Sequence, residues 1–191
     1  MNLIRELNNP CTQEYVELKE YVHGSGIPWF YQPTTGSVHD DEGKKMDIPL
    51  WGHHVMVRPN LLGKPYSTIT SDSFESCCTV LGQIFAHNGI QVSVIYRINF
   101  NLTYNNRNKL TPWHQDLEFP HSNMLIYLNK FGNGCTYVRD GDTEERHTPK
   151  EDGIILFGGE FDHRHSAPKR YERRIVMVVN FLELIRADLV E

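Results

Sequence analysis

The sequence lacks both a long apolar run and a cluster of basic residues. No stretch of about 18 consecutive apolar residues occurs, as a membrane-spanning helix would need, and the first ten residues carry charges where a signal peptide has its apolar core. The chain has 24 acidic and 19 basic residues, a net charge of −5, and no run of Lys and Arg longer than two. We therefore expect no membrane association, and the acidic balance disfavours nucleic acid as a partner.

Cysteine is also scarce. The four cysteines have no zinc-type spacing, and the adjacent pair Cys77 and Cys78 is a poor start for a disulfide framework. Reduced thiols in the cytoplasm are the expectation. With 191 residues and 39% hydrophobic content, the chain is long enough to bury a core without metals or disulfides as supports, and we expect a single domain over residues 1–191.

Two helices are expected. Thr12 is a suitable N-cap for a helix whose apolar residues recur at helical spacing up to Gly24. A second helix is predicted from the apolar stripe over residues 74–85, which should pack on a sheet and which Asn88-Gly89 ends.

The remaining periodic segments are strand-like. From residue 91 the apolar period changes to two, which predicts a long half-buried strand interrupted only at Ile95. Shorter candidates follow at residues 124–128, 135–138, 153–157 and 174–182. Helices followed by a run of antiparallel strands imply the α+β class, with a jelly-roll, cupin-like core and packed N-terminal helices.

Residues 25–70 are rich in Gly, Pro, His and Trp and lack sustained periodicity. Long irregular segments in compact enzymes often line the site, so we expect substrate contacts here. His53 and His54 resemble a metal-binding pair, but consecutive strand residues face opposite ways, which favours a structural or substrate-lining role.

The motif with the clearest chemistry is His114-Gln115-Asp116. If residues 113–117 are extended, His114 and Asp116 point to the same face and can offer a nitrogen and an oxygen to one ion. A second imidazole must then come from elsewhere. Two histidines and one carboxylate on one face of an octahedron are typical of non-haem Fe(II) oxygenases, although His-x-Asp alone occurs often by chance.

The order of the following segments makes the motif specific. They are Tyr127-Leu128-Asn129, Gly134-Cys135-Thr136, residues 149–157, His163 or His165, and Arg174 at the start of a hydrophobic strand. With them, residues 90–182 resemble the 2-oxoglutarate/Fe(II)-dependent dioxygenase superfamily. The likeness is closest to small oxygenases of bacteriophages and marine viruses and looser to prolyl hydroxylases and AlkB-type demethylases. It implies a double-stranded β-helix core.

The resemblance also implies the metal ligands, namely His114, Asp116 and one later histidine. Six residues on from Phe157 is His163, as in the viral relatives, and eight residues on is His165, as in the prolyl hydroxylases. We favour His163 and keep His165 as the alternative.

Arg174 matches the basic residue that binds the far carboxylate of 2-oxoglutarate in the superfamily, and Tyr127 matches a tyrosine that supports the same carboxylate. If Arg174 points inward, Val176, Val178 and Asn180 follow it on the interior. Many relatives place Ser or Thr shortly after the arginine, whereas this chain has valines there, so the second anchor of the cosubstrate is not predicted.

The implied activity is oxidation of a substrate C–H bond, by default hydroxylation, with Fe(II), 2-oxoglutarate and O2 as cofactors and with release of succinate and CO2. No catalytic residue beyond the metal centre is expected. The substrate is open among small molecules, peptides and protein side chains. Two alternatives remain: a non-enzymatic jelly-roll binding or viral structural module, which needs no inward charge, and a cupin-like metalloenzyme, which needs no arginine on the last strand.

Overall fold

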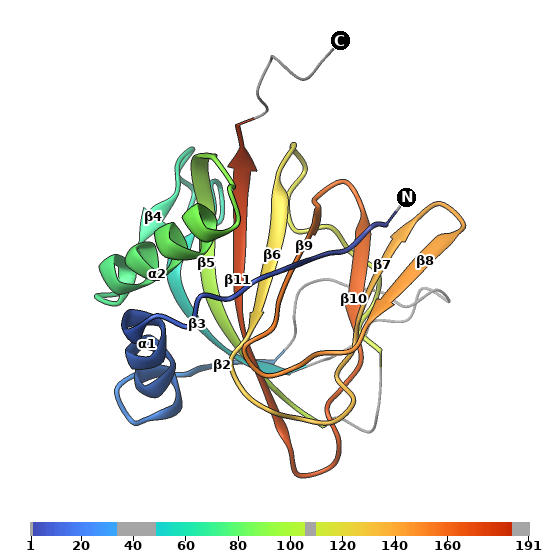
Figure 1. Cartoon of the computed structure of the whole chain (residues 1–191), viewed down its shortest axis with the longest axis horizontal. Coiled ribbons are helices and arrows are strands. Elements are labelled where there is room, and N and C mark those ends of the chain that lie inside the picture. Colours follow the sequence, from blue (N-terminus) through green and yellow to red (C-terminus); the bar gives the residue numbers. More distant parts are fainter. Residues whose placement is uncertain (1, 34–48, 106–109, 185–191) are drawn as a thin grey trace.

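Two antiparallel sheets face each other in the computed structural model, which describes residues 2–33, 49–105 and 110–184. The larger sheet has the strand order β1-β9-β6-β11-β5-β3-β2, with β4 paired to β3. The smaller sheet has the order β10-β7-β8 (Figure 1). The strands of the larger sheet are β1 (Arg5–Leu7), β2 (Phe30–Gln32), β3 (Leu50–Val57), β4 (Thr68–Ile69), β5 (Val92–Tyr104), β6 (Ser122–Tyr127), β9 (Ile154–Gly158) and β11 (Arg173–Glu183). Those of the smaller sheet are β7 (Thr136–Asp140), β8 (Thr143–His147) and β10 (Asp162–His165).

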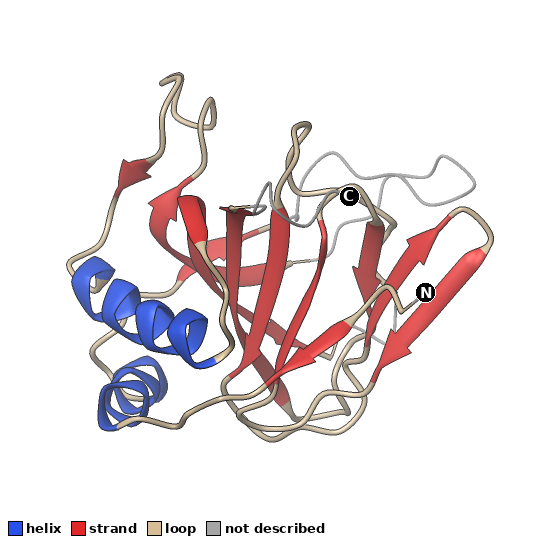
Figure 2. Cartoon of the chain, turned by 45° about the horizontal axis from the view of Figure 1, so that its top comes forward, coloured by secondary structure: helices blue, strands red, loops and turns tan. Residues whose placement is uncertain are grey.

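The two helices, α1 (Gln13–His23) and α2 (Phe74–His87), cover the face of the larger sheet that is turned away from the smaller one (Figure 2). Their apolar stripes supply buried residues to one core with β5 and β11, and Phe85 of α2 packs on Phe181 with ring centroids 4.8 Å apart. A second apolar cluster lies on the opposite face of the large sheet and includes Val138 of the smaller sheet. The predicted α+β class, with a jelly-roll core and packed helices, is confirmed. Within the described ranges, neither helix is long and apolar enough to cross a membrane.

Strand β11 shows the predicted alternation. Ile175, Met177 and Val179 pack in the core beneath the helices, whereas Val176 and Val178 belong to the cluster on the inner face. Because successive side chains of a strand alternate between faces, Arg174 and Asn180 also point inward.

Strand β5 departs from its predicted alternation at Ile95. The pairing with β11 shifts by one residue there, since Asn180 opposes Arg97 but Phe181 opposes Ile95. Ile98, Phe100 and Leu102 are buried in the core beneath the helices, as expected. Ile95 packs against the same core, because the shift changes which residues of β5 lie on the face that the helices cover. The residue that interrupts the sequence pattern thus marks an irregularity in the ladder.

Several short elements were not predicted. Strands β1, β8 and β10 are three to five residues long and polar, so their sequences carry no apolar period. The condition set for residues 113–117, an extended segment, is not met as a strand, because only an isolated bridge at His114 and a bend at Asp116 occur there.

Helix α1 begins where the sequence predicts. Thr12 has extended backbone angles, and its hydroxyl accepts a hydrogen bond from the Tyr15 N–H at 3.3 Å while donating to the Gln83 side chain of α2 at 2.6 Å. One side chain therefore caps the helix and ties it to the second helix.

We expect Thr12→Ala to lower the free energy of unfolding by about 1 kcal/mol, because the cap and the link to α2 are both lost. Urea unfolding followed by circular dichroism measures this. Thr12→Ser keeps the hydroxyl and serves as the control. Equal stability of Thr12→Ala and the native protein would show that the cap contributes nothing.

Candidate metal centre

A short backbone bridge brings His114 and His163 side by side. The N–H of His114 donates to the His163 carbonyl at 3.1 Å, and the N–H of His163 donates back at 2.9 Å. Directly opposed residues of such a pair hold their side chains on the same side. The two imidazole centroids are accordingly 4.4 Å apart. These residues lie 49 positions apart in the sequence, so no local pattern could show the pairing.

Asp116 completes a group of three metal-binding side chains. One ligand atom from each of His114, Asp116 and His163 lies within 4.8 Å of the others, an arrangement that could hold a metal ion. The Nδ1–H of His114 donates to the Pro112 carbonyl at 3.0 Å, which leaves its Nε2 lone pair for a ligand. The two side chains of His-x-Asp therefore come together without a shared strand.

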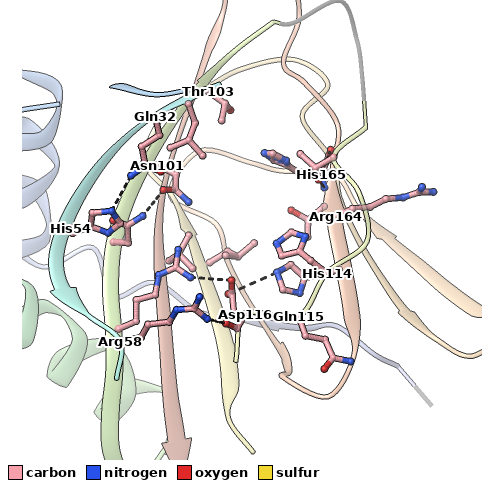
Figure 3. A pocket seen from close by; sticks show the side chains of 18 of the residues that line it. Gln32, His54, Arg58, Asn101, Thr103, His114, Gln115, Asp116, Arg164 and His165 are labelled. Atoms are coloured by element: carbon pink, nitrogen blue, oxygen red, sulfur yellow. Dashed lines mark hydrogen bonds and ion pairs between the residues drawn. The ribbon is translucent and has the colours of Figure 1, made fainter. Parts of the chain in front are cut away.

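The two candidate third ligands lie on the same face of β10. His163 and His165 both line the cavity described below, whereas the Arg164 guanidinium lies on the other side, 4.0 Å from the centroid of the Trp113 ring and 3.6 Å from Glu144 (Figure 3). His163 is in the group of three and His165 is not. The geometry therefore favours His163.

Polar groups of the larger sheet hold the Asp116 carboxylate. Arg97 of β5 donates to Oδ1 at 3.0 Å, and Asn180 of β11 donates to Oδ2 at 3.0 Å. Arg58 donates to the main-chain carbonyl of the same residue. Burial alone would raise the pKa of Asp116, but the charge of Arg97 and the neighbouring groups hold it well below its ordinary value. The carboxylate is thus kept ionised inside the protein.

Burial has the opposite effect on the histidine partner. Desolvation, with the charge of His114 next, lowers the pKa of His163 to about 4. At neutral pH the imidazole is therefore uncharged. An ionised carboxylate beside a neutral imidazole is the protonation state that binds a divalent cation.

Arg174 lies deep on the inner face of the larger sheet and is 4% exposed. Its Nε donates to the Gly134 carbonyl at 3.3 Å and its Nη2 to the Thr136 hydroxyl at 3.4 Å. Tyr127, fully buried, is hydrogen-bonded to the same hydroxyl at 2.8 Å, but it is not among the residues that line the cavity. Thr136 therefore stands between the predicted tyrosine and the open space.

Gly134 is required beside this arginine. Its φ is +64°, a region that only glycine adopts readily, and an added Cβ would meet the Phe131 ring at 2.6 Å and the Arg174 side chain at 3.3 Å. The glycine thus lets the backbone carbonyl approach the guanidinium closely.

A cavity of about 540 Å³ joins the three metal-binding side chains to Arg174. Its opposite wall comes from the segment of residues 25–70, which contains β2 and β3, and from the inner face of β5, namely Gln32, Leu50, His54, Val57, Arg58, Leu61, Arg97, Asn99, Asn101 and Thr103 (Figure 3). Residues 34–48 of that segment lie outside the described ranges. His54 faces the cavity and contacts Gln32 at 2.9 Å, whereas His53 turns away to Pro28 and Ser71. The opposite orientations predicted for the two histidines are confirmed.

Three contributors to the site were not predicted in these roles. In the sequence, Arg97 is one of the polar residues that alternate with the apolar residues of the long strand, and nothing else distinguishes it. Arg58 belongs to no motif. Thr136 belongs to a segment of the resemblance, but its position beside Arg174 depends on the pairing of β7 with β10. The sequence feature that could have revealed them is the row of polar residues on the strand face opposite the apolar face. By the same alternation, Asn180 was expected on the interior face if Arg174 points there.

No family model and no curated protein matches the sequence. Solved structures do match. A 2-oxoglutarate-Fe(II) oxygenase family protein from Burkholderia pseudomallei superposes with a TM-score of 0.65 at 14% identity, over 94% of this chain and 84% of that one. A prolyl hydroxylase from Trichoplax adhaerens, solved with a peptide of hypoxia inducible factor, gives 0.59 at 12% identity over 96% and 84%. The epimerase SnoN, solved with Fe3+, alpha ketoglutarate and nogalamycin RO, gives 0.56 at 11% identity over 95% and 79%.

Identities this low show the fold alone, and the closer likeness to phage and viral oxygenases stays a prediction. The agreement extends over nearly the whole chain, whereas the sequence resemblance covered residues 90–182. The chain therefore has the double-stranded β-helix fold of the 2-oxoglutarate/Fe(II) oxygenases and carries a His-x-Asp and distal His triad within it.

Proposed function

We propose that this protein is an Fe(II)- and 2-oxoglutarate-dependent dioxygenase that oxidises, by default hydroxylates, a C–H bond of a substrate held in the cavity, with release of succinate and CO2. The observation that carries the proposal is the placement of three metal-binding side chains and one buried arginine around the same cavity. The fold shared with 2-oxoglutarate/Fe(II) oxygenases supports it.

The donor set fits Fe(II). Two imidazoles and one carboxylate offer three ligand atoms from one side and leave the cavity side open for further ligands. We propose His114, Asp116 and His163 as the ligands. Arg97 and Asn180 would orient the carboxylate from behind, as outer contacts do in other metal sites.

Arg174 fits the far carboxylate of 2-oxoglutarate. Within the described part of the chain no carboxylate pairs with this guanidinium, and a buried charge without a counter-ion is costly. A carboxylate can accept two parallel hydrogen bonds from a guanidinium. We propose that the Thr136 hydroxyl is the second anchor that the sequence did not reveal, and that Tyr127 fixes Thr136.

Bound iron would supply the oxidising chemistry, together with 2-oxoglutarate and O2. The protein contributes binding and shielding. Asp116 is ionised and His163 is uncharged, which are the protonation states in which they would bind the metal. Arg174 and Thr136 would orient the cosubstrate. The cavity shields the buried side of the site, where His163 and Arg174 lie, whereas His114 is exposed.

The two alternative functions fit the site less well. A structural or binding module has no use for Arg174 and Asp116 on the inner face, because burying charged groups is costly. A cupin-like enzyme without 2-oxoglutarate usually has more histidine ligands, whereas the group of three contains two, and neither His54 nor His165 joins it.

Metal binding should depend on His163 and not on His165. We expect His163→Gln to weaken Fe(II) binding by more than about 100-fold, because a ligand of the ion is removed. His165→Gln should bind Fe(II) as the native protein does. Anaerobic isothermal titration with Fe(II) measures both variants. The reverse pattern would make His165 the third ligand.

Cosubstrate binding should depend on Arg174. We expect Arg174→Gln to retain Fe(II) and to lose affinity for 2-oxoglutarate by about 100-fold or more, because the bidentate ion pair is lost. The visible metal-to-ligand charge-transfer band, followed during anaerobic titration with 2-oxoglutarate, reports the affinity. Arg173→Gln is the control, since Arg173 directly precedes Arg174 in the same strand and its side chain is exposed. No band in the iron-loaded native protein would contradict the proposed use of 2-oxoglutarate.

A further inference from the structure

We propose that the substrate is a small molecule with an anionic oxyacid group, a carboxylate or a phosphate, that Arg58 and Arg97 bind. The inference rests on the proposed function and names the class of substrate for the same cavity.

The two arginines lie together at the metal end of the cavity. Arg97 is on the inner face of β5, and Arg58 directly follows Val57, the last residue of the adjacent strand β3. Both reach Asp116, one at its carboxylate and the other at its main-chain carbonyl (Figure 3). Two guanidinium groups therefore face the space beside the metal-binding carboxylate.

Most of their hydrogen-bonding capacity is unused. A guanidinium has five N–H donors. Asp116 is the one residue to which either guanidinium donates within the described ranges, in each case through Nη1. Both residues line the cavity, and none of their nitrogens is among the buried atoms that lack a partner. The remaining donors are accessible to a ligand in the cavity.

The charges of the cavity wall are unbalanced. Among the described lining residues, Asp116 is the only carboxylate, whereas Arg58, Arg97, Arg164 and Arg174 are cationic. Arg164 directs its guanidinium to Glu144 and Trp113, outside the cavity. Fe(II) and the 2-oxoglutarate dianion cancel each other in charge. The loaded site keeps an excess of positive charge.

Arg174, the proposed anchor of the far carboxylate of 2-oxoglutarate, and this arginine pair lie at different ends of the strands. Thr103 opposes Arg174, and Arg97 opposes Asn180, so the two basic positions are separated by six residues of β5, or about 20 Å along the strand. 2-Oxoglutarate is a five-carbon diacid. When it is anchored at Arg174, the unpaired N–H groups of Arg58 and Arg97 stay available to another ligand.

The wall between these ends is polar but uncharged. Asn99, Asn101 and Thr103 follow Arg97 on the inner face of β5, and the Asn99 side-chain oxygen and the Thr103 hydroxyl are buried with no partner in the described part of the chain. Because the two oxygens are closed to solvent, this wall offers a ligand polar, uncharged side chains rather than free acceptor atoms. Since about 540 Å³ must also hold the metal and the cosubstrate, a small hydrogen-bonding anion fits best.

The test measures anion binding to the complex with Mn(II), in place of Fe(II), and saturating 2-oxoglutarate. Acetate and methylphosphonate are the probes for the carboxylate and phosphate classes, acetamide is the neutral match of acetate, and sodium chloride keeps the ionic strength constant. We expect one of the anions, and not acetamide, to raise the melting temperature of the native complex in a saturable manner. The anion that does so identifies the class.

The variants identify the arginine. We expect Arg58→Gln to weaken the anion about tenfold or more and Arg58→Lys to retain most of the affinity, because lysine keeps the charge. Arg170→Gln is the control for the same exchange on the exterior. Failure of both anions to bind, or equal binding by Arg58→Gln, would overturn the proposal.

The charge-transfer titration separates this proposal from the proposed function. If the native protein shows no band with 2-oxoglutarate, the proposed function fails first. If the band is present but Arg58→Gln loses 2-oxoglutarate affinity as Arg174→Gln does, the arginine pair binds the cosubstrate and the substrate assignment is wrong.

Discussion

The pairing of β5 with β11 is the constraint on which the rest of the site depends. These are the two longest described strands, and the unbroken register from Arg173 opposite Tyr104 to Asn180 opposite Arg97 fixes which of their residues face the smaller sheet. A slip of one residue would exchange the core and cavity faces of a strand, and the apolar residues beneath the helices oppose such a slip. The same pairing therefore stabilises the core, presents Arg97 and Arg174 to the cavity and places Asn180 behind Asp116.

Much of this arrangement was readable from the sequence because it is periodic. Both helices and the two long strands follow from the local spacing of apolar residues. The shift at Ile95 was visible as a break in the pattern, but its effect on register depends on the opposing strand. The short polar strands carry no period, so they could not be predicted.

The site was only partly readable because its geometry is non-local. His-x-Asp contains two of the three metal-binding side chains that lie together, but they come together without the shared strand face that the sequence argument set as a condition. A backbone bridge to His163, 49 positions later, aligns His114. Because the bridge pairs His114 with His163 and not with His165, it also distinguishes the two candidate ligands. Counting along the chain left both histidines open, whereas pairing across it distinguishes them. Arg97 was overlooked for the same reason, since its role depends on a loop that folds back over β5.

The placement of the triad between the two sheets has a mechanical consequence. His163 belongs to β10 of the smaller sheet, whereas Asp116 is held by side chains from β5 and β11 of the larger one. An ion bound by His163 and Asp116 would link the two sheets, so separation of the sheets would also release the ion. By mass action the stability of the folded chain would then rise with the logarithm of the free metal concentration.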